Sequence, residues 1–259
     1  MPVGRFTFMS TPAPAISEME IRLPGPSESG SSQDTEWCEV ELDGEFRRFR
    51  FHDYHEIYDV PGLYERLFYS ELKCVSPATV AGMLVSVAEE DGRRSSDLAV
   101  LDVGAGNGMV GEELKDAGAG AVVGVDIIEE AKLAVERDRP DVYDDYFVVD
   151  MTAIPPDTDA YLRDHRLNAL TCVAALGFDD IPPPVFQAAL EYVAPGGLMG
   201  FSIKESFLGD EDQSGFATFI RESVATGATR LRDQARYRHR LSATGEALHY
   251  VGIVAEKAG

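Results

Sequence analysis

The sequence predicts an α/β protein with a doubly wound, mostly parallel seven-stranded sheet that ends in an antiparallel hairpin, preceded by a β-hairpin and a helical lid. Three observations support this expectation. Apolar runs alternate with helical patterns from about residue 76 onward, as in a parallel sheet with helices on both faces. Three of the runs carry an acidic residue at their end, and a glycine-rich turn follows the first. The last two extended segments flank a glycine, as in an antiparallel pair.

Composition divides the chain before the sheet into two parts. Residues 1–33 are rich in proline, serine and glycine, which predicts a flexible tail. In residues 34–75, alternating apolar residues flank an Asp-Gly pair at 43–44, a strong signal for a tight hairpin turn. Aromatic residues then gather at 52–69, where we expect a lid. Residues 76–259 remain for the sheet domain.

The glycine-rich turn reads Asp-Val-Gly-Ala-Gly-Asn-Gly at 102–108, between an apolar run at 98–103 and a helical pattern. Glycine lets a ligand approach the backbone closely, and the helix that follows offers free N–H groups at its first turn. The turn therefore predicts a cofactor site. Its spacing differs from the dinucleotide fingerprint G-x-G-x-x-G, because Met109 stands where the third glycine belongs.

Further strand ends continue the pattern. The run at 122–126 ends in an acid 24 residues after Asp102, and the run at 146–150 ends in another acid 24 residues later. A Pro-Gly-Gly turn then leads into a strand within 192–201. This ordered series resembles the class I S-adenosylmethionine (SAM)-dependent methyltransferases over about residues 76–259. The resemblance implies a Rossmann-like domain that binds SAM, transfers its methyl group and releases S-adenosylhomocysteine (SAH).

Helical patterns join the strands. Ser76 and Pro77 suit the N-cap and first position of a helix that runs to about Glu90. Further helices are expected at about 108–117, 129–138, 183–193 and 215–225. The strands are expected at about 98–103, 122–126, 146–150, 170–176, within 192–201, and at 229–239 and 248–256.

The resemblance assigns the cofactor to the strand ends. Asp126 is expected to accept hydrogen bonds from the ribose hydroxyls, since a carboxylate suits a vicinal diol. Asp150 is expected to meet the adenine amino group, with a helix N-cap as the alternative. Asp102 either holds the glycine turn or reaches the methionine amino group through water. The cofactor-binding residues so implied are Asp102, Gly104, Ala105, Gly106, Asp126, Ile127, Asp150, Met151, Ala174 and Tyr58.

The aromatic segment before the sheet is the candidate lid. Tyr54 and Tyr58 are one helical turn apart, and aromatic faces attract a sulfonium cation. His55 is the candidate general base, because histidine titrates near neutral pH. The alternative is that these aromatic residues only pack the lid against the core.

The acceptor is expected to be a small molecule. Family members that methylate amides or adenine carry Asn- or Asp-Pro-Pro-aromatic after the fourth strand, whereas residues 173–184 read Val-Ala-Ala-Leu-Gly-Phe-Asp-Asp-Ile-Pro-Pro-Pro. Oxygen is therefore our first expectation for the methylated atom, and nitrogen or carbon the second. Two other functions stay open: a SAM-binding protein without methyl transfer, and an NAD(P)-dependent oxidoreductase, which Met109 disfavours.

Charge and composition limit the partners. The net charge of −22 opposes phosphate backbones and anionic membranes, so we expect neither nucleic acid nor a membrane as a partner. Three widely spaced cysteines fit a reducing cytoplasm. Histidines and cysteines show no metal-ligand spacing, and we expect no metal. Nothing in the sequence indicates an oligomeric state.

Overall fold

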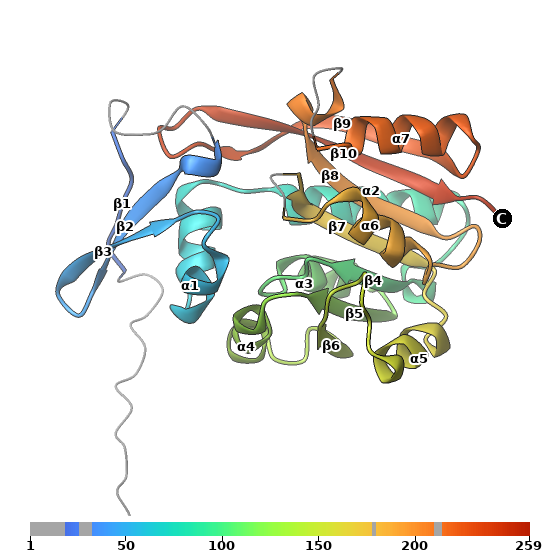
Figure 1. Cartoon of the computed structure of the whole chain (residues 1–259), viewed down its shortest axis with the longest axis horizontal. Helices are drawn as coiled ribbons and strands as arrows, with labels where there is room; N and C mark the ends of the chain where they lie inside the picture. The colour runs from blue at the N-terminus through green and yellow to red at the C-terminus, as the bar shows by residue number, and fades with distance from the viewer. Residues whose placement is uncertain (1–18, 26–32, 178–179, 210–213) are drawn as a thin grey trace, which may run out of the picture.

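The computed structural model describes residues 19–25, 33–177, 180–209 and 214–259. They form two sheets, and Figure 1 shows the smaller, N-terminal sheet and helix α1 beside the larger sheet. The smaller sheet is antiparallel, in the order β1-β2-β3, and its strands are β1 (Ile21–Arg22), β2 (Trp37–Leu42) and β3 (Glu45–Arg50).

The larger sheet has seven strands in the order β6-β5-β4-β7-β8-β10-β9. The first five in this order are parallel, and β10 pairs antiparallel with both β8 and β9. This architecture confirms the predicted fold class. Its strands are β4 (Ala99–Val103), β5 (Ala121–Asp126), β6 (Asp145–Val148), β7 (Ala169–Leu176), β8 (Leu198–Lys204), β9 (Thr229–Leu241) and β10 (Ala247–Lys257).

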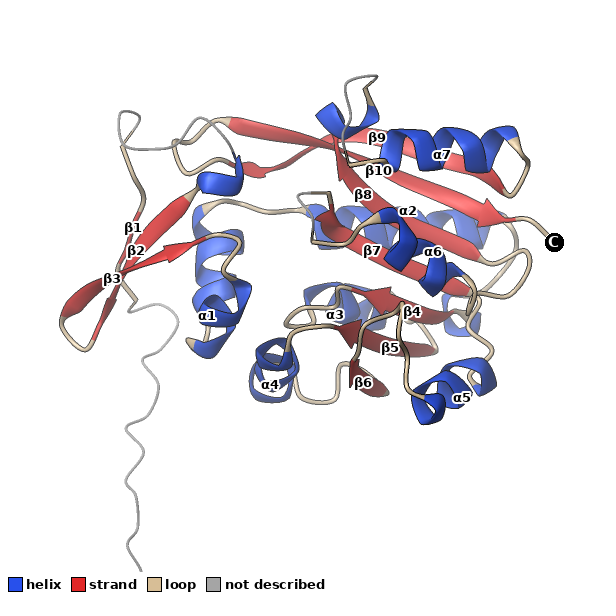
Figure 2. Ribbon diagram, viewed as in Figure 1, coloured by secondary structure: helices blue, strands red, loops and turns tan. Residues whose placement is uncertain are grey.

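Helices cover both faces of this sheet (Figure 2). Successive strand residues point to opposite faces, so Val100 packs with α2 and α3 while Leu101 packs with α5, α6 and α7. The helices are α1 (Tyr54–Asp59), a π-helix (Glu65–Glu71), α2 (Ser76–Glu90), α3 (Met109–Asp116), α4 (Glu129–Asp138), α5 (Pro156–Asp164), α6 (Pro183–Leu190) and α7 (Phe216–Ala225).

The predicted hairpin is present, and its turn has the expected geometry. Asp43 and Gly44 both have positive φ, +54° and +83°, as a two-residue type I′ turn requires. The prediction of a flexible tail over residues 1–33 was wrong for its last part. Ile21 in β1 pairs with Val40 in β2, and Met19 is buried beside them, because β1 covers an edge that the hairpin leaves open. Residues 1–18 and 26–32 lie outside the described residues.

The lid has a core of its own and docks on the larger sheet's helices. Leu63 and Leu67 are buried with Phe51 under the small sheet. On its other side, Tyr58 of α1 packs on Ala131 and on the neighbouring apolar surface of α4. The lid is therefore fixed between the small sheet and α4, over the strand ends that carry the predicted site.

Among the described helices, none is by itself long and apolar enough to cross a membrane. One pair bent by 78°, formed by the π-helix and α2, passes that test by length and composition only.

Candidate active site

Asp126 stands at the end of β5 and holds the glycine turn. Its Oδ2 accepts a hydrogen bond from Gly106 N at 2.8 Å, and its Oδ1 accepts from Ile127 N at 2.7 Å and Ile128 N at 3.0 Å. Burial raises the pKa of Asp126, although these three N–H groups favour its charged form. The carboxylate is thus fixed in direction, and its oxygens keep acceptor capacity for a ligand hydroxyl.

The glycine turn leaves no room for side chains. Gly104 has φ +67°, and a Cβ there would lie 2.7 Å from Cδ1 of Ile181. Gly106 has φ +53°, and a Cβ there would lie 2.6 Å from the hydroxyl oxygen of Tyr58. Both positions combine a left-handed backbone with close contact, so the turn has the form of a cradle.

Asp102 lies beneath this cradle rather than in it. Its Oδ2 accepts a hydrogen bond from the Tyr143 hydroxyl and its Oδ1 from Thr171 Oγ1, both at 2.7 Å. The side chain is buried and lines neither of the cavities described below. Burial raises its pKa to about 7. These contacts fit the first of the two roles considered for Asp102, a support of the turn, and its contact with the cofactor through water stays a prediction.

A cavity of about 150 Å³, which we call the cofactor cavity, opens along the ends of β4 to β7. Seven of the ten predicted cofactor residues line it. They are Gly104, Asp126, Ile127, Asp150, Met151, Ala174 and Tyr58. Ala105 and Gly106 line a second cavity instead.

One end of the cofactor cavity forms an apolar slot with a polar edge. Ile127 is 68% exposed, unusual for a large apolar residue, while Met151 is buried, and both line this cavity. Asp150 accepts hydrogen bonds from Thr152 N at 2.8 Å and Thr152 Oγ1 at 2.7 Å. Since α5 begins only at Pro156, Asp150 does not cap that helix. This slot therefore offers two apolar side chains and one carboxylate acceptor.

The second cavity, which we call the inner cavity, lies between the glycine turn, the lid and the terminal hairpin, and its volume is about 70 Å³. It shares a wall with the cofactor cavity. The residues of this wall are Tyr54, Tyr58, Tyr64, Gly104, Val173 and Ala174. A ligand group could therefore reach from one cavity into the other at this place.

Ala174 gives this wall an unusual backbone. Its φ is +56°, a left-handed value that residues with a Cβ rarely adopt. Its N–H donates to Ser202 Oγ at 2.9 Å, and the pairing of β7 with β8 is irregular between Cys172 and Leu176. Such strain is found most often at functional sites, because the surrounding structure must hold it in place.

The lid aromatics fall into two groups, those that pack in the lid's core and those that line the cavities. Phe51 and Phe68 pack in the lid's own core, with ring centroids 5.7 Å apart. Tyr54, Tyr58 and Tyr64 line both cavities in a row, with successive centroid separations of 6.2 and 5.1 Å. Burial raises the pKa of all three hydroxyls, so the rings stay neutral.

The structure does not bring His55 to either cavity. The inward side of α1 carries Ile57 and Tyr58, so His55 is exposed on the opposite side. His52, just before α1, lines the inner cavity instead. Its Nδ1 lies 3.4 Å from Oδ2 of Asp180, a residue of the turn after β7 that lines the cofactor cavity. The preceding residue, Asp179, lies outside the described residues.

The terminal hairpin supplies residues that the sequence did not indicate. His239, Arg240 and Tyr250 all line the inner cavity. Arg240 is 3% exposed, and its Nη2 donates to Glu36 Oε2 at 2.6 Å. His239 stacks on Tyr250 with centroids 4.0 Å apart, and burial holds the pKa of His239 well below its usual range. Strand β9 is mostly exposed until this point, so its sequence pattern gives little sign of these buried groups.

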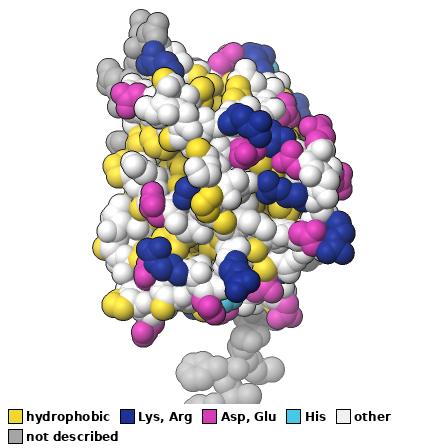
Figure 3. Space-filling model, turned by 90° about the vertical axis from the view of Figure 1, so that its right-hand side faces the viewer, with side chains coloured by type: hydrophobic (Ala, Val, Ile, Leu, Met, Phe, Trp, Pro, Cys, Tyr) yellow, Lys and Arg dark blue, Asp and Glu magenta, His cyan; other side chains and the backbone are white. Residues whose placement is uncertain are grey.

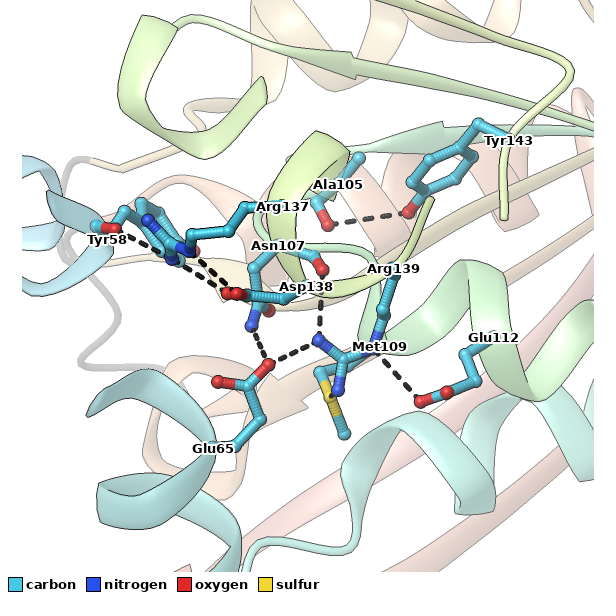
Figure 4. A network of polar contacts seen from close by, with 10 residues as sticks. All are labelled: Tyr58, Glu65, Ala105, Asn107, Met109, Glu112, Arg137, Asp138, Arg139 and Tyr143. Atoms are coloured by element: carbon cyan, nitrogen blue, oxygen red, sulfur yellow. Dashed lines mark hydrogen bonds and ion pairs between the residues drawn. The ribbon is translucent and has the colours of Figure 1, made fainter. Parts of the chain in front are cut away.

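A polar network fastens the lid to the glycine turn (Figure 4). Glu65 of the π-helix accepts hydrogen bonds on Oε1 from Asn107 Nδ2, at 2.7 Å, and from Arg139 Nη1. Arg139 Nε also donates to Glu112 of α3 at 3.0 Å. From the neighbouring turn of α4, Arg137 Nη2 donates to the Tyr58 backbone oxygen at 3.1 Å. The lid and the cradle are thus one connected unit.

Comparisons with known proteins agree with this geometry. Residues 101–201, from β4 into β8, match the methyltransferase domain family. The fold is similar to that of a protein from Pyrococcus horikoshii described as a proposed RNA methyltransferase, with 16% identity over 72% of this chain and 88% of that chain and a TM-score of 0.52. It is also similar to a SAM-dependent methyltransferase from Anabaena variabilis, with 12% identity, 79% and 93% coverage and a TM-score of 0.52. No protein with a curated description matches the chain.

The fold and the matched segment define the class of the protein. The chain contains a class I methyltransferase domain, and the cofactor of this domain is SAM. The matched domain and the fold agree with the class that the glycine turn and the strand-end acids predicted.

Proposed function

We propose that the protein transfers the methyl group of SAM to a hydroxyl oxygen of a small molecule, with His52 as the general base and Asp180 as its positioning residue. One observation carries this proposal: the His52–Asp180 pair, separated by 3.4 Å, joins the inner cavity to the cofactor cavity. A base at that junction would stand beside the path of an acceptor oxygen toward the sulfonium of bound SAM.

Different residues of the cofactor cavity suit the different chemical groups of SAM. The slot beside Ile127 and Asp150 would hold adenine, and Asp126 would accept the ribose hydroxyls. The rest of the cofactor would extend over Gly104 to the wall that the two cavities share, beside Tyr58, and leave the inner cavity to the acceptor. Bound SAM supplies an electrophilic methyl group on a sulfonium.

The pair can act as a base because a carboxylate lies beside one nitrogen of the imidazole. Asp180 Oδ2 lies 3.4 Å from Nδ1, so it would hold a proton on that side of the imidazole, and Nε2 would take the proton of the acceptor hydroxyl. As the acceptor oxygen forms its bond to the methyl carbon, the carbon–sulfur bond breaks and the hydroxyl proton passes to Nε2 of His52. Asp180 stabilises the imidazolium so formed.

Size and charge support a small acceptor. The lid and the terminal hairpin enclose the inner cavity, which is about 70 Å³ and admits a small group only. The chain carries a net charge of −22, which opposes a polyanion. On the face shown in Figure 3, basic and acidic side chains are interspersed rather than gathered into a basic track.

Product analysis tests this function. The full chain is incubated with SAM and a panel of small phenols and alcohols, and mass spectrometry follows SAH and a 14-dalton gain in each compound. We expect product with some members, and a loss of about 10²- to 10⁴-fold in turnover for His52→Gln. Asp180→Asn should lower turnover less and shift its pH profile.

His55→Gln is the matched control, because His55 lies on the same lid but is exposed. Loss of turnover in His55→Gln but not in His52→Gln would reverse the assignment. SAM binding without SAH formation across oxygen, nitrogen and carbon acceptors would favour a SAM-binding protein that transfers no methyl group.

A further inference from the structure

We propose that the end of the inner cavity at the terminal hairpin recognises the acceptor, and that Oε1 of Gln33 accepts a hydrogen bond from an uncharged O–H or N–H group of that molecule. This inference rests on the proposed function and names the chemistry of its substrate.

The sheet order separates this end from the cofactor. Asp150 follows β6, Asp126 ends β5, the glycine turn follows β4, and Ala174 lies in β7. On the far side of β7 come β8, β10 and β9, and the last two carry Tyr250 and Arg240. The inner cavity extends from the glycine turn to these two residues. Its hairpin end is thus the part beyond the sulfonium position, where the acceptor must lie.

Gln33 presents an unused acceptor there. The residue is 8% exposed and lines the inner cavity, and its Nε2 donates to the Tyr250 hydroxyl at 3.0 Å. Within the described part of the chain, its Oε1 is buried and has no hydrogen-bond partner. Buried polar atoms in native proteins almost always have partners, so a ligand donor would complete this group.

The charges at this end are already balanced. Arg240 is paired with Glu36, and both side chains are buried. His239 is buried beside them, with its Nδ1 2.6 Å from Ser76 Oγ. A charged acceptor would therefore enter a low-dielectric site without a counter-charge. An uncharged molecule avoids that cost.

The walls favour a flat, apolar body. The rings of Phe51, Tyr54, Phe68 and Tyr250 line the inner cavity, and Cys74 adds a further apolar contact. Aromatic walls of this kind pack well against a ring. A neutral phenol combines the ring with one O–H donor, and it serves as the probe.

Binding of small aromatic probes to the full chain, with saturating SAH, tests the inference by titration calorimetry. Phenol supplies the donor, fluorobenzene has nearly the same shape without it, and benzoate adds a charge. We expect phenol to bind about 10-fold more tightly than either. Gln33→Leu should remove this preference and leave SAH affinity unchanged.

Two further variants test whether a preference for phenol depends on the Gln33 side chain. Gln234→Leu makes the same change at an exposed position of β9 and should keep the preference for phenol. Tyr250→Phe keeps the ring, removes the hydroxyl that orients Gln33, and should reduce the preference even if Gln33→Leu folds poorly. Equal affinities for phenol and fluorobenzene, or a preference that survives both Gln33→Leu and Tyr250→Phe, would overturn the inference. Failure of SAH to bind would instead overturn the proposed function.

Discussion

Replacing Asp126 with alanine tests the cofactor site most directly. We expect Asp126→Ala to weaken SAH binding by about 1.5–3 kcal/mol, because hydrogen bonds from the ribose hydroxyls to a charged carboxylate are lost. This corresponds to about a 10- to 150-fold rise in Kd. The variant should also lose some stability, since the N–H groups of Gly106, Ile127 and Ile128 lose their shared acceptor.

The two effects can be separated in one set of measurements. Titration calorimetry with SAH gives the affinity, and thermal unfolding without ligand gives the stability. Asp116→Ala, at an exposed acid of α3, is the matched control and should change neither. An unchanged Kd for Asp126→Ala in a folded protein would refute the ribose role and the placement of the cofactor along β5.

Four further changes have defined outcomes. Gly104→Val should abolish SAH binding with near-native circular dichroism, because its side chain would meet Ile181 at a φ of +67°, and normal binding would mean that the turn is no cradle. Tyr58→Ala should weaken SAH binding by about 0.5–2 kcal/mol if the ring meets the sulfonium, and Tyr58→Phe should not. The pKa of Asp102 is raised to about 7 in the folded state, so its contribution to stability is fully present below the unfolded value of 3.8 and is lost as pH rises through 7. The free energy of unfolding should therefore fall by up to about 4 kcal/mol as pH rises from 3.8 to 7, and Asp102→Asn should remove this fall. An unchanged pH dependence in Asp102→Asn would contradict the raised pKa. Deleting residues 1–33 should lower the melting temperature, since β1, Met19 and Gln33 are lost with it, and an unchanged melting temperature would show that these contacts contribute nothing.

The local sequence was enough to predict where the helices and strands of the fold lie. Strand and helix positions follow from apolar periodicity, which records which side of each element is buried. The Asp43-Gly44 turn has to adopt positive φ, and only a few residue pairs do so readily. Asp126 and Asp150 could be placed because a parallel strand that ends in an acid brings that acid to one known edge of the sheet.

Residues brought together from distant parts of the chain could not be placed in this way. His52 and His55 look alike in the sequence. The structure separates them, because His52 precedes α1 and lines the inner cavity whereas His55 is on the exposed side of α1. Asp102 and Asp126 both follow apolar runs, yet Tyr143 and Thr171 cover the first. Burial of these groups depends on which elements pack on them, and that is a tertiary property.

The sequence by itself determined the sheet, the order of its elements and the cofactor cradle, because each depends on a short pattern with one physical solution. Tertiary structure decided which lid residues face the cavities and which merely pack. It also brought Gln33 within 3.0 Å of Tyr250, across 217 positions of chain, and paired Glu36 with Arg240 across 204. No local pattern encodes such contacts, since they form only when the small sheet, the lid and the terminal hairpin close on the same space.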